Sequence, residues 1–109
     1  KYKTIENVQI ILLEGIFALY DQNIRDLMEI KLFVDTPSDV RILRRIKRDI
    51  NQRKRTIESV MEQYNKTVRP MFIKYVTPTK EYADLIIPYG GKNKISIDTI
   101  VTKIKKYYI

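Results

Sequence analysis

The residues of this chain that could do chemistry are carboxylates and cations. The 109-residue sequence contains no histidine and no cysteine. These absences exclude a zinc site of the usual kind, a Ser-His pair and a thiolate nucleophile. They also exclude a disulfide framework. Binding or catalysis must therefore rest on the acids and on the numerous lysines and arginines.

Positive charge is concentrated in one short window. The formal net charge is +8, and between Arg41 and Arg55 eight cations stand against a single acid, Asp49. Arginines three or four positions apart on a helix repel one another by roughly 0.2–0.5 kcal/mol per pair, so such a helix gains from an anionic ligand. Arginine also suits bidentate contacts with phosphate oxygens and the charge that develops in phosphoryl transfer. The window predicts a polyphosphate-binding helix, with a solvated basic face as the plain alternative.

A nucleic-acid surface is a competing interpretation of the same window. Base stacking on aromatic side chains is a common part of single-strand recognition, yet no aromatic residue lies between Arg41 and Arg55. We therefore keep a basic nucleic-acid-binding module only as an alternative and do not expect nucleic acid as the partner.

Two acids directly follow apolar runs. Glu14 comes after residues 8–13, and Asp35 after residues 30–34. In open parallel α/β sheets, ligands bind beyond the carboxyl ends of the strands, where an acid can hold a metal or orient a substrate. Gly15 allows close backbone approach beside Glu14, which makes Glu14 the better candidate. Asp35 is expected to orient the helix start that follows it, and the plain alternative is that each acid begins a solvated loop.

The elements that would position these residues are those of an α/β domain with a parallel sheet and helical crossovers. Runs 8–13, 30–34 and 84–87 are apolar and end abruptly, as strands buried in a parallel sheet do. A short buried helix is the alternative for the first run. Because a buried strand needs neighbours and only two strands follow the first, we expect a missing partner upstream of Lys1.

The arginine window lies on a predicted helix. Thr36 can cap this helix, Pro37 suits its first position, and Asp39 can reach back as in a capping box. Apolar residues at spacings of three and four continue from Val40 and predict an end near residue 52.

Similar spacing predicts three other helices. A short one begins near Asp21. A long one spans residues 57–68 and is interrupted near Pro70, which cannot donate to the helical ladder, and Met71, Phe72 and Tyr75 can continue it. The last spans residues 97–108. No repeat or linker divides the chain, so 1–109 is expected to be part of one domain.

Composition limits the functions further. Apolar residues make up 44% of the chain and charged residues 31%, as in soluble globular proteins. No apolar run could span a bilayer and the first residues do not resemble a secretory signal, so we expect a cytoplasmic protein without a membrane partner. The only glycines are Gly15, Gly90 and Gly91, so a GxxxxGK(S/T) phosphate loop is absent. Standing alone, the chain should not turn over ATP.

Several blocks in this order resemble the uridine/cytidine kinase family. The resemblance extends from about Val8 to Ile104, and its blocks include ILLEGIFALY at 11–20, KLFVDT at 31–36 and RRIKRDI at 44–50. Further similar blocks lie at residues 24–27, 62–64, 68–71, 78–84 and 86–88. Agreement in so many colinear blocks is more specific than any single motif. The chain is similar to the carboxy-terminal half of such an enzyme, without the upstream half that carries the phosphate loop.

The resemblance implies a P-loop kinase fold of three layers, with a parallel sheet, helices on both faces and an arginine-rich helical lid at about 41–58. It implies transfer of a phosphoryl group from ATP to uridine or cytidine with Mg²⁺, in pyrimidine salvage. The implied enzyme is a homo-oligomer, with a tetramer as the expected state. By resemblance, Glu14 helps to hold the metal. The lid arginines Arg48 and Arg53 reach the ATP phosphates as catalytic residues. The implied nucleoside-binding residues are Arg45, Arg55 and Gln63, and Lys92 lies at an ATP-binding position.

The chain departs from the family pattern at a few positions. The family usually has Arg-Gly-Arg-Asp where this chain has Arg53-Lys54-Arg55-Thr56, and an acid where it has Lys92. After Pro88 the chain has Tyr89 where the family usually has arginine. These changes put nucleotide affinity in doubt and favour, as a second hypothesis, a nucleotide-binding remnant without catalysis. Uridine phosphorylation, competent only with the upstream half, remains the first.

Overall fold

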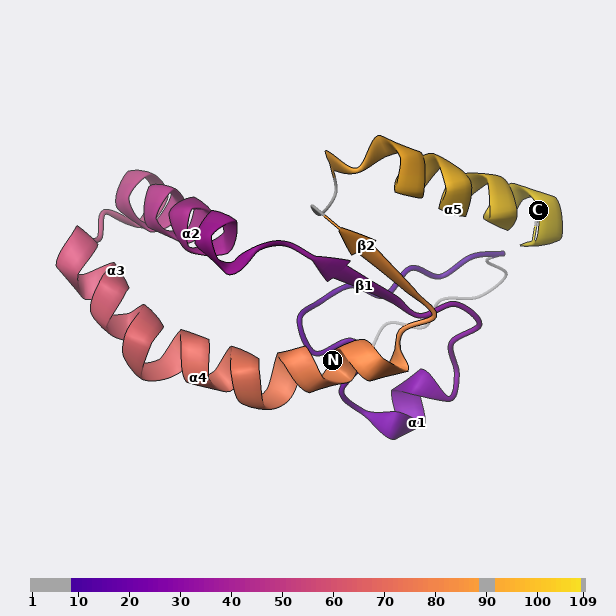
Figure 1. Cartoon of the computed structure of the whole chain (residues 1–109), viewed down its shortest axis with the longest axis horizontal. Coiled ribbons are helices and arrows are strands. Elements are labelled where there is room, and N and C mark those ends of the chain that lie inside the picture. Colours follow the sequence, from indigo (N-terminus) through magenta and orange to yellow (C-terminus); the bar gives the residue numbers. More distant parts are fainter. Residues whose placement is uncertain (1–8, 89–91, 109) are drawn as a thin grey trace.

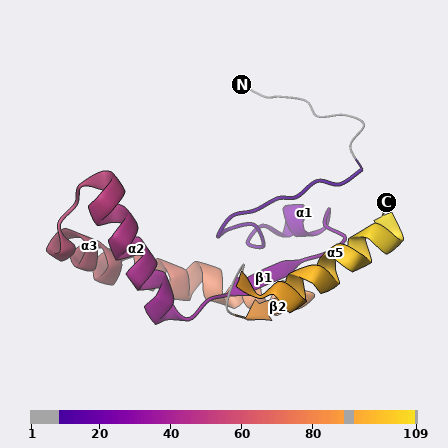
Figure 2. The same cartoon turned by 90° about the horizontal axis from the view of Figure 1, so that it is seen from above.

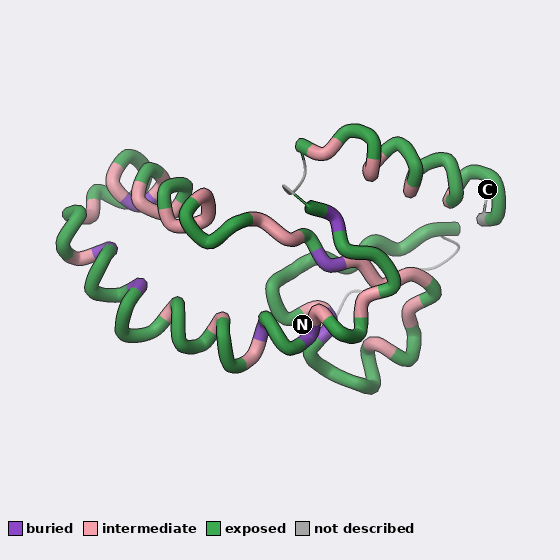
Figure 3. The backbone as a smooth tube through the Cα atoms, in the orientation of Figure 1, coloured by how far each residue is buried: buried purple, intermediate pink, exposed green. Residues whose placement is uncertain are grey.

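The structure is a computed structural model that describes residues 9–88 and 92–108. Its centre is a pair of strands, from which a helical arm extends to one side (Figures 1 and 2). The Cα radius of gyration is 16.7 Å, against about 13 Å for a compact chain of roughly this length. Few residues are fully buried, as Figure 3 shows along the chain. The fold is therefore an open assembly with a small core.

The two strands are parallel neighbours. Strand β1 (Leu32–Asp35) pairs with β2 (Leu85–Pro88), with Leu32 opposite Leu85. Asp84 stabilises the start of this strand pair, because its Oδ2 accepts a 2.7 Å hydrogen bond from the Lys31 amide. The long helical crossover between the strands confirms the prediction of an α/β chain with a parallel pair.

The predicted first strand is wrong. Residues 9–13 form no strand, and Leu12 is 84% exposed; Val8, where the predicted run begins, lies outside the described residues. A strand is held by the backbone hydrogen bonds of a neighbour, and within residues 9–88 and 92–108 the sheet contains only β1 and β2. Apolar, β-branched composition thus produced a strand pattern without the pairing that a strand requires.

The small core forms where the crossover returns to β1. Phe33 of β1 packs with Leu19 and Val76, and Met28 and Phe72 pack against this cluster. Leu19 is held there by Arg25, whose Nη1 donates 2.8 Å hydrogen bonds to the carbonyls of Leu19 and Tyr20. The core therefore joins the early segment to the crossover.

Two predicted helix starts have different outcomes. The short helix near Asp21 is present as α1 (Gln22–Arg25), capped by the Asp21 carboxylate. The long helix α2 (Ser38–Arg53) begins later than predicted, with Pro37 as the N-cap and no side-chain cap. The capping box of Thr36 and Asp39 is therefore absent, although the predicted end near residue 52 agrees with the last residue, Arg53.

The next helical segment continues through Pro70 instead of being interrupted there. It begins with α3 (Ile57–Gln63) and passes through a π-helical turn, η1 (Tyr64–Val68), into α4 (Arg69–Met71). A second π turn, η2 (Phe72–Val76), and the 3-10 helix η3 (Thr77–Tyr82) complete it. The π turns on both sides of Pro70 change the hydrogen-bonding register, which allows the helix to pass a residue without an amide hydrogen.

The last helix, α5 (Lys94–Tyr108), begins three residues before the predicted start. It lies beside β2, because Thr99, Ile100 and Lys103 line one hollow together with Leu85 and Asp84. Among the residues that the structure describes, no helix is both long and apolar enough to cross a membrane.

Candidate functional site

The arginine window forms a helical arm, here defined as residues 38–63. Its helices α2 and α3 are joined by residues 54–56 and lie beside each other at one end of the molecule (Figure 1). On α2, the apolar residues Val40, Ile46 and Ile50 are half-buried. Val60 of α3 has no exposed surface, so the arm has a small apolar contact of its own.

The turn of the arm has a defined backbone geometry. Lys54 adopts the left-handed conformation, with φ 52° and ψ 37°, which usually favours glycine because a Cβ is crowded there. The Asp49 carbonyl accepts hydrogen bonds from the amides of both Lys54 and Arg55. Thr56 then caps α3 by accepting a 3.1 Å hydrogen bond from the Ser59 amide. The position at which the resemblance implies glycine is therefore the position that has a positive φ.

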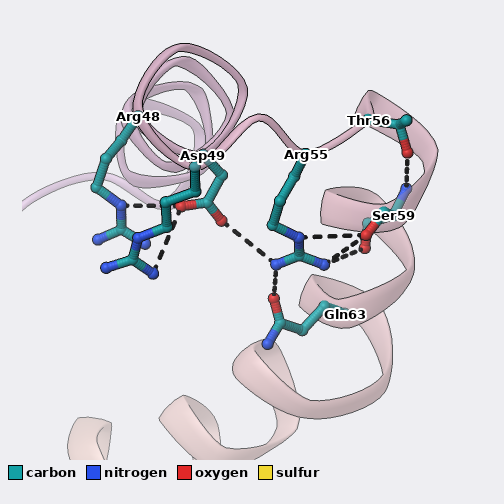
Figure 4. A network of polar contacts seen from close by, with 7 residues as sticks. Arg48, Asp49, Arg55, Thr56, Ser59 and Gln63 are labelled. Atoms are coloured by element: carbon teal, nitrogen blue, oxygen red, sulfur yellow. Dashed lines mark hydrogen bonds and ion pairs between the residues drawn. The ribbon is translucent and has the colours of Figure 1, made fainter.

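The carboxylate of Asp49 is the centre of the arm's polar network (Figure 4). Its Oδ1 accepts a 2.9 Å hydrogen bond from Arg48 Nε and lies 3.8 Å from Arg53 Nη1. Its Oδ2 lies 3.6 Å from Arg55 Nη1 and makes no hydrogen bond among the described residues. The Asp49 side chain has no exposed surface, although the arginines that cover it remain partly exposed.

Burial and charge act in opposite directions on Asp49. Burial alone raises the pKa of its carboxyl group. The hydrogen bond from Arg48 and the charges of Arg48, Arg53 and Arg45 outweigh burial and hold the pKa below its usual value of 3.8. Asp49 is therefore ionised at neutral pH and offsets part of the repulsion among the arginines.

Arg55 connects the turn to α3. Its Nε and Nη2 donate to Ser59 Oγ at 3.2 and 2.6 Å, and Nη2 also reaches the Ser59 carbonyl at 3.1 Å. Its Nη1 donates to Gln63 Oε1. The structure thus brings the predicted nucleoside-binding residues Arg55 and Gln63 together, with the donors of Arg55 directed at partners within the arm.

Arg48 and Arg53 are held more loosely. Arg48 contacts Asp49 through Nε, and its two terminal nitrogens have no hydrogen-bonding partner within the described part of the chain. Arg53 is 61% exposed and reaches Asp49 only at 3.8 Å. These arginines therefore have donors available for an anionic ligand. Arg45, also on α2, is half-buried.

The other predicted site residues lie outside this network. Glu14 is exposed and stands before Gly15, whose φ of +149° accounts for the glycine. Lys92 is exposed just before α5. Asp35 accepts a 3.1 Å hydrogen bond from Lys80 Nζ, so it links β1 to η3 instead of orienting the start of α2. No group of three or more acids within residues 9–88 and 92–108 could hold a metal by itself, and Glu14 offers a single carboxylate.

Asp49 is the residue that sequence reasoning missed. It was visible only as the one acid in a basic window. An acid on a helix surrounded by arginines is a common solvated ion-pair pattern, and nothing in the sequence indicated that its side chain would be covered. The α2–α3 turn, which brings Arg55 back toward α2, supplies that cover.

The fold and the arm define an α/β protein with a cationic arm suited to an anionic ligand. A sequence model described as Phosphoribulokinase / Uridine kinase family matches residues 1–96. The chain is 57% identical over 101 residues to a uridine kinase of Halalkalibacterium halodurans, covering 93% of this chain and 48% of the relative. It is 51% identical over 105 residues to a uridine kinase of Escherichia coli K12, covering 96% of this chain and 49% of the relative. The chain belongs to the phosphoribulokinase/uridine kinase family.

The match covers nearly all of this chain but only part of each relative. A uridine kinase of Ligilactobacillus salivarius is 52% identical over 101 residues, which are 93% of this chain and 47% of that protein. The chain thus spans about half the length of the curated relatives it matches.

Proposed function

We propose that this chain is part of an enzyme that transfers the terminal phosphoryl group of ATP to the 5′-hydroxyl of uridine or cytidine, in pyrimidine salvage. One observation carries the proposal: identities of 51–57% to uridine kinases over more than nine-tenths of the chain. The arginine arm supports it, because phosphoryl transfer depends on positioned cations that stabilise charge on the phosphate oxygens.

Arg48 and Arg53 are the proposed contacts to the ATP phosphates. The terminal nitrogens of Arg48 are free within the described part of the chain, and Arg53 is largely exposed. Closing of the arm would bring both guanidinium groups to the phosphates and neutralise the charge that develops during transfer. Lys92, exposed before α5, is the proposed further contact to ATP.

Arg45, Arg55 and Gln63 are the proposed nucleoside-binding residues. Arg55 and Gln63 are hydrogen-bonded to each other, so a nucleoside that binds both must exchange this bond for bonds of its own. Because Arg55 also donates to Ser59, this exchange adds a reorganisation cost that the new bonds to the nucleoside must offset.

Glu14 is the proposed protein ligand for Mg²⁺. Magnesium bound to nucleotides is commonly held by one or two carboxylates together with phosphate oxygens and water, so one carboxylate fits that arrangement without forming a metal centre alone. When bound, the ion would neutralise charge between the phosphates. We further propose a cytoplasmic enzyme, from the composition of the chain, and a homotetramer, from family resemblance.

The test is ADP release by the full polypeptide that the gene encodes, with Mg²⁺ and ATP, in the presence of uridine, of cytidine, or of no nucleoside. Release that depends on either nucleoside is the expected result. No release above the nucleoside-free control would contradict the proposal and favour the alternative of a nucleotide-binding remnant. Salt-sensitive binding to RNA or DNA that is lost with the arginines of the arm would instead favour a nucleic-acid-binding module.

A further inference from the structure

Asp49 is a costly feature of the arm if its only purpose is stability. Its carboxylate has no exposed surface, and its Oδ2 makes no hydrogen bond within the described residues. A buried charge with incomplete hydrogen bonding is often matched or bettered in stability by an apolar side chain of similar volume. Val60 of α3, which is fully buried, shows that the arm can accommodate such a side chain.

The contacts of Asp49 favour a role in aiming arginines. The carboxylate holds Arg48 by Nε, the nitrogen nearest the chain, at 2.9 Å. This bond restricts the guanidinium group and leaves both terminal nitrogens available for two phosphate oxygens. On the other side, Arg55 Nη1 at 3.6 Å links the same carboxylate to α3. Asp49 therefore contacts two arginines: Arg48, whose terminal nitrogens have no partner within the described residues, and Arg55, which is hydrogen-bonded to α3.

We propose that Asp49 is a positioning residue that holds Arg48 with its terminal nitrogens presented to the phosphates of the ligand. The identity of the ligand as ATP rests on the proposed function. The same arrangement of Asp49 and Arg48 suits any polyphosphate. Asp49 itself does not touch the ligand, because its oxygens are covered by the arginines. Its effect must therefore pass through Arg48.

The test is a double-mutant cycle of Asp49→Asn and Arg48→Ala in the full polypeptide. Asparagine keeps the size of the side chain and removes its charge. We expect Asp49→Asn to lower kcat/KM for ATP about tenfold or more, because small displacements of a positioned group have large kinetic effects. In the Arg48→Ala background, the same change should have little further effect. Asp98→Asn, an exposed aspartate on α5, is the matched control and should leave kcat/KM unchanged.

A merely structural role predicts a different pattern. If Asp49 only stabilises the arm, Asp49→Asn should lower kcat/KM by the same factor with and without Arg48, and that result would overturn the proposal. No effect of Asp49→Asn in folded protein would overturn it too. If Asp49→Asn does not fold, Asp49→Glu replaces it, because it keeps the charge but displaces it by one methylene, and the same non-additivity is expected.

Binding of inorganic tripolyphosphate, measured by calorimetry on the same proteins, separates this proposal from the proposed function. The positioning role is supported if Asp49→Asn weakens tripolyphosphate binding when Arg48 is present but not in the Arg48→Ala background. This holds even if no nucleoside is phosphorylated. Nucleoside-dependent turnover in which the effects of Asp49→Asn and Arg48→Ala are additive would retain the proposed function and reject the positioning role of Asp49. Failure of the unmodified protein both to bind tripolyphosphate and to turn over would reject both.

Discussion

The Nη1 atom of Arg55 lies 3.6 Å from Oδ2 of Asp49, across the turn that joins α2 to α3 (Figure 4). Through this contact, two residues six positions apart connect both helices of the arm to one carboxylate. The backbone reinforces the contact, because the Arg55 amide also donates a 3.0 Å hydrogen bond to the Asp49 carbonyl. The geometry of the turn thus determines where the arginines of the arm can point.

Replacing Lys54 with glycine should stabilise the protein. Lys54 has a φ of 52°, and a non-glycine residue in this conformation carries a strain of roughly 1–2 kcal/mol. Part of the gain is offset by the greater freedom of glycine in the unfolded chain, so we expect about 0.5–1 kcal/mol. Denaturant unfolding of the full polypeptide measures the change.

Lys47→Gly is the matched control for this substitution. Lys47 is exposed within α2, where glycine should destabilise by about 1 kcal/mol. Destabilisation of similar size at both positions would contradict the left-handed conformation of Lys54.

Thr56→Ala should destabilise the arm by about 1 kcal/mol, because it removes the oxygen that accepts the Ser59 amide. Thr56→Asp should retain the cap, since aspartate is an equally good N-cap. Thermal unfolding of both variants, with the exposed Thr67→Ala as control, measures this effect. Equal stability of Thr56→Ala and the unmodified protein would show that the cap is not formed.

The stabilising effect of Asp49 should depend on pH in the acid range. Its pKa is held below 3.8 in the folded chain, so its ionised form stabilises folding above that value. This contribution is lost as the pH falls through the lower folded pKa. The difference in melting temperature between the unmodified protein and Asp49→Asn should therefore shrink as the pH falls from about 5 to about 3. A difference that grows over this range would contradict the direction of the pKa shift.

Local sequence patterns predicted the elements that have local causes. The helix beginning near Asp21 and the arginine helix both appear, because each depends on short-range periodicity. The apolar runs before Asp35 and Pro88 form strands because each finds the other as its partner. The strand predicted at residues 8–13 is absent from residues 9–13, because pairing with another strand is a non-local requirement. Pro70 was misjudged for a related reason: π turns can carry a helix past proline, and no simple spacing rule signals them.

The candidate site could be predicted only in part. Resemblance singled out Arg55 and Gln63, and the structure places them in contact. Asp49, which lies at the centre of the network, was not singled out, because its importance depends on the turn at Lys54 that brings Arg55 back over α2. The residue types indicated a cationic arm. The turn between α2 and α3 determines which arginines bind partners within the arm and which have donors available for a ligand.

The most direct test of the account compares Arg48→Ala with Arg44→Ala in nucleoside-dependent ADP release by the full polypeptide. Both arginines lie on α2, but Arg44 is exposed and has no ion pair within the described residues, whereas Arg48 is held by Asp49. Loss of a positioned charge-stabilising donor should lower kcat by about 10²–10³-fold for Arg48→Ala, with near-normal turnover for Arg44→Ala. Equal turnover of the two variants, or full activity without Arg48, would contradict the central claim that the arm acts in phosphoryl transfer through Arg48.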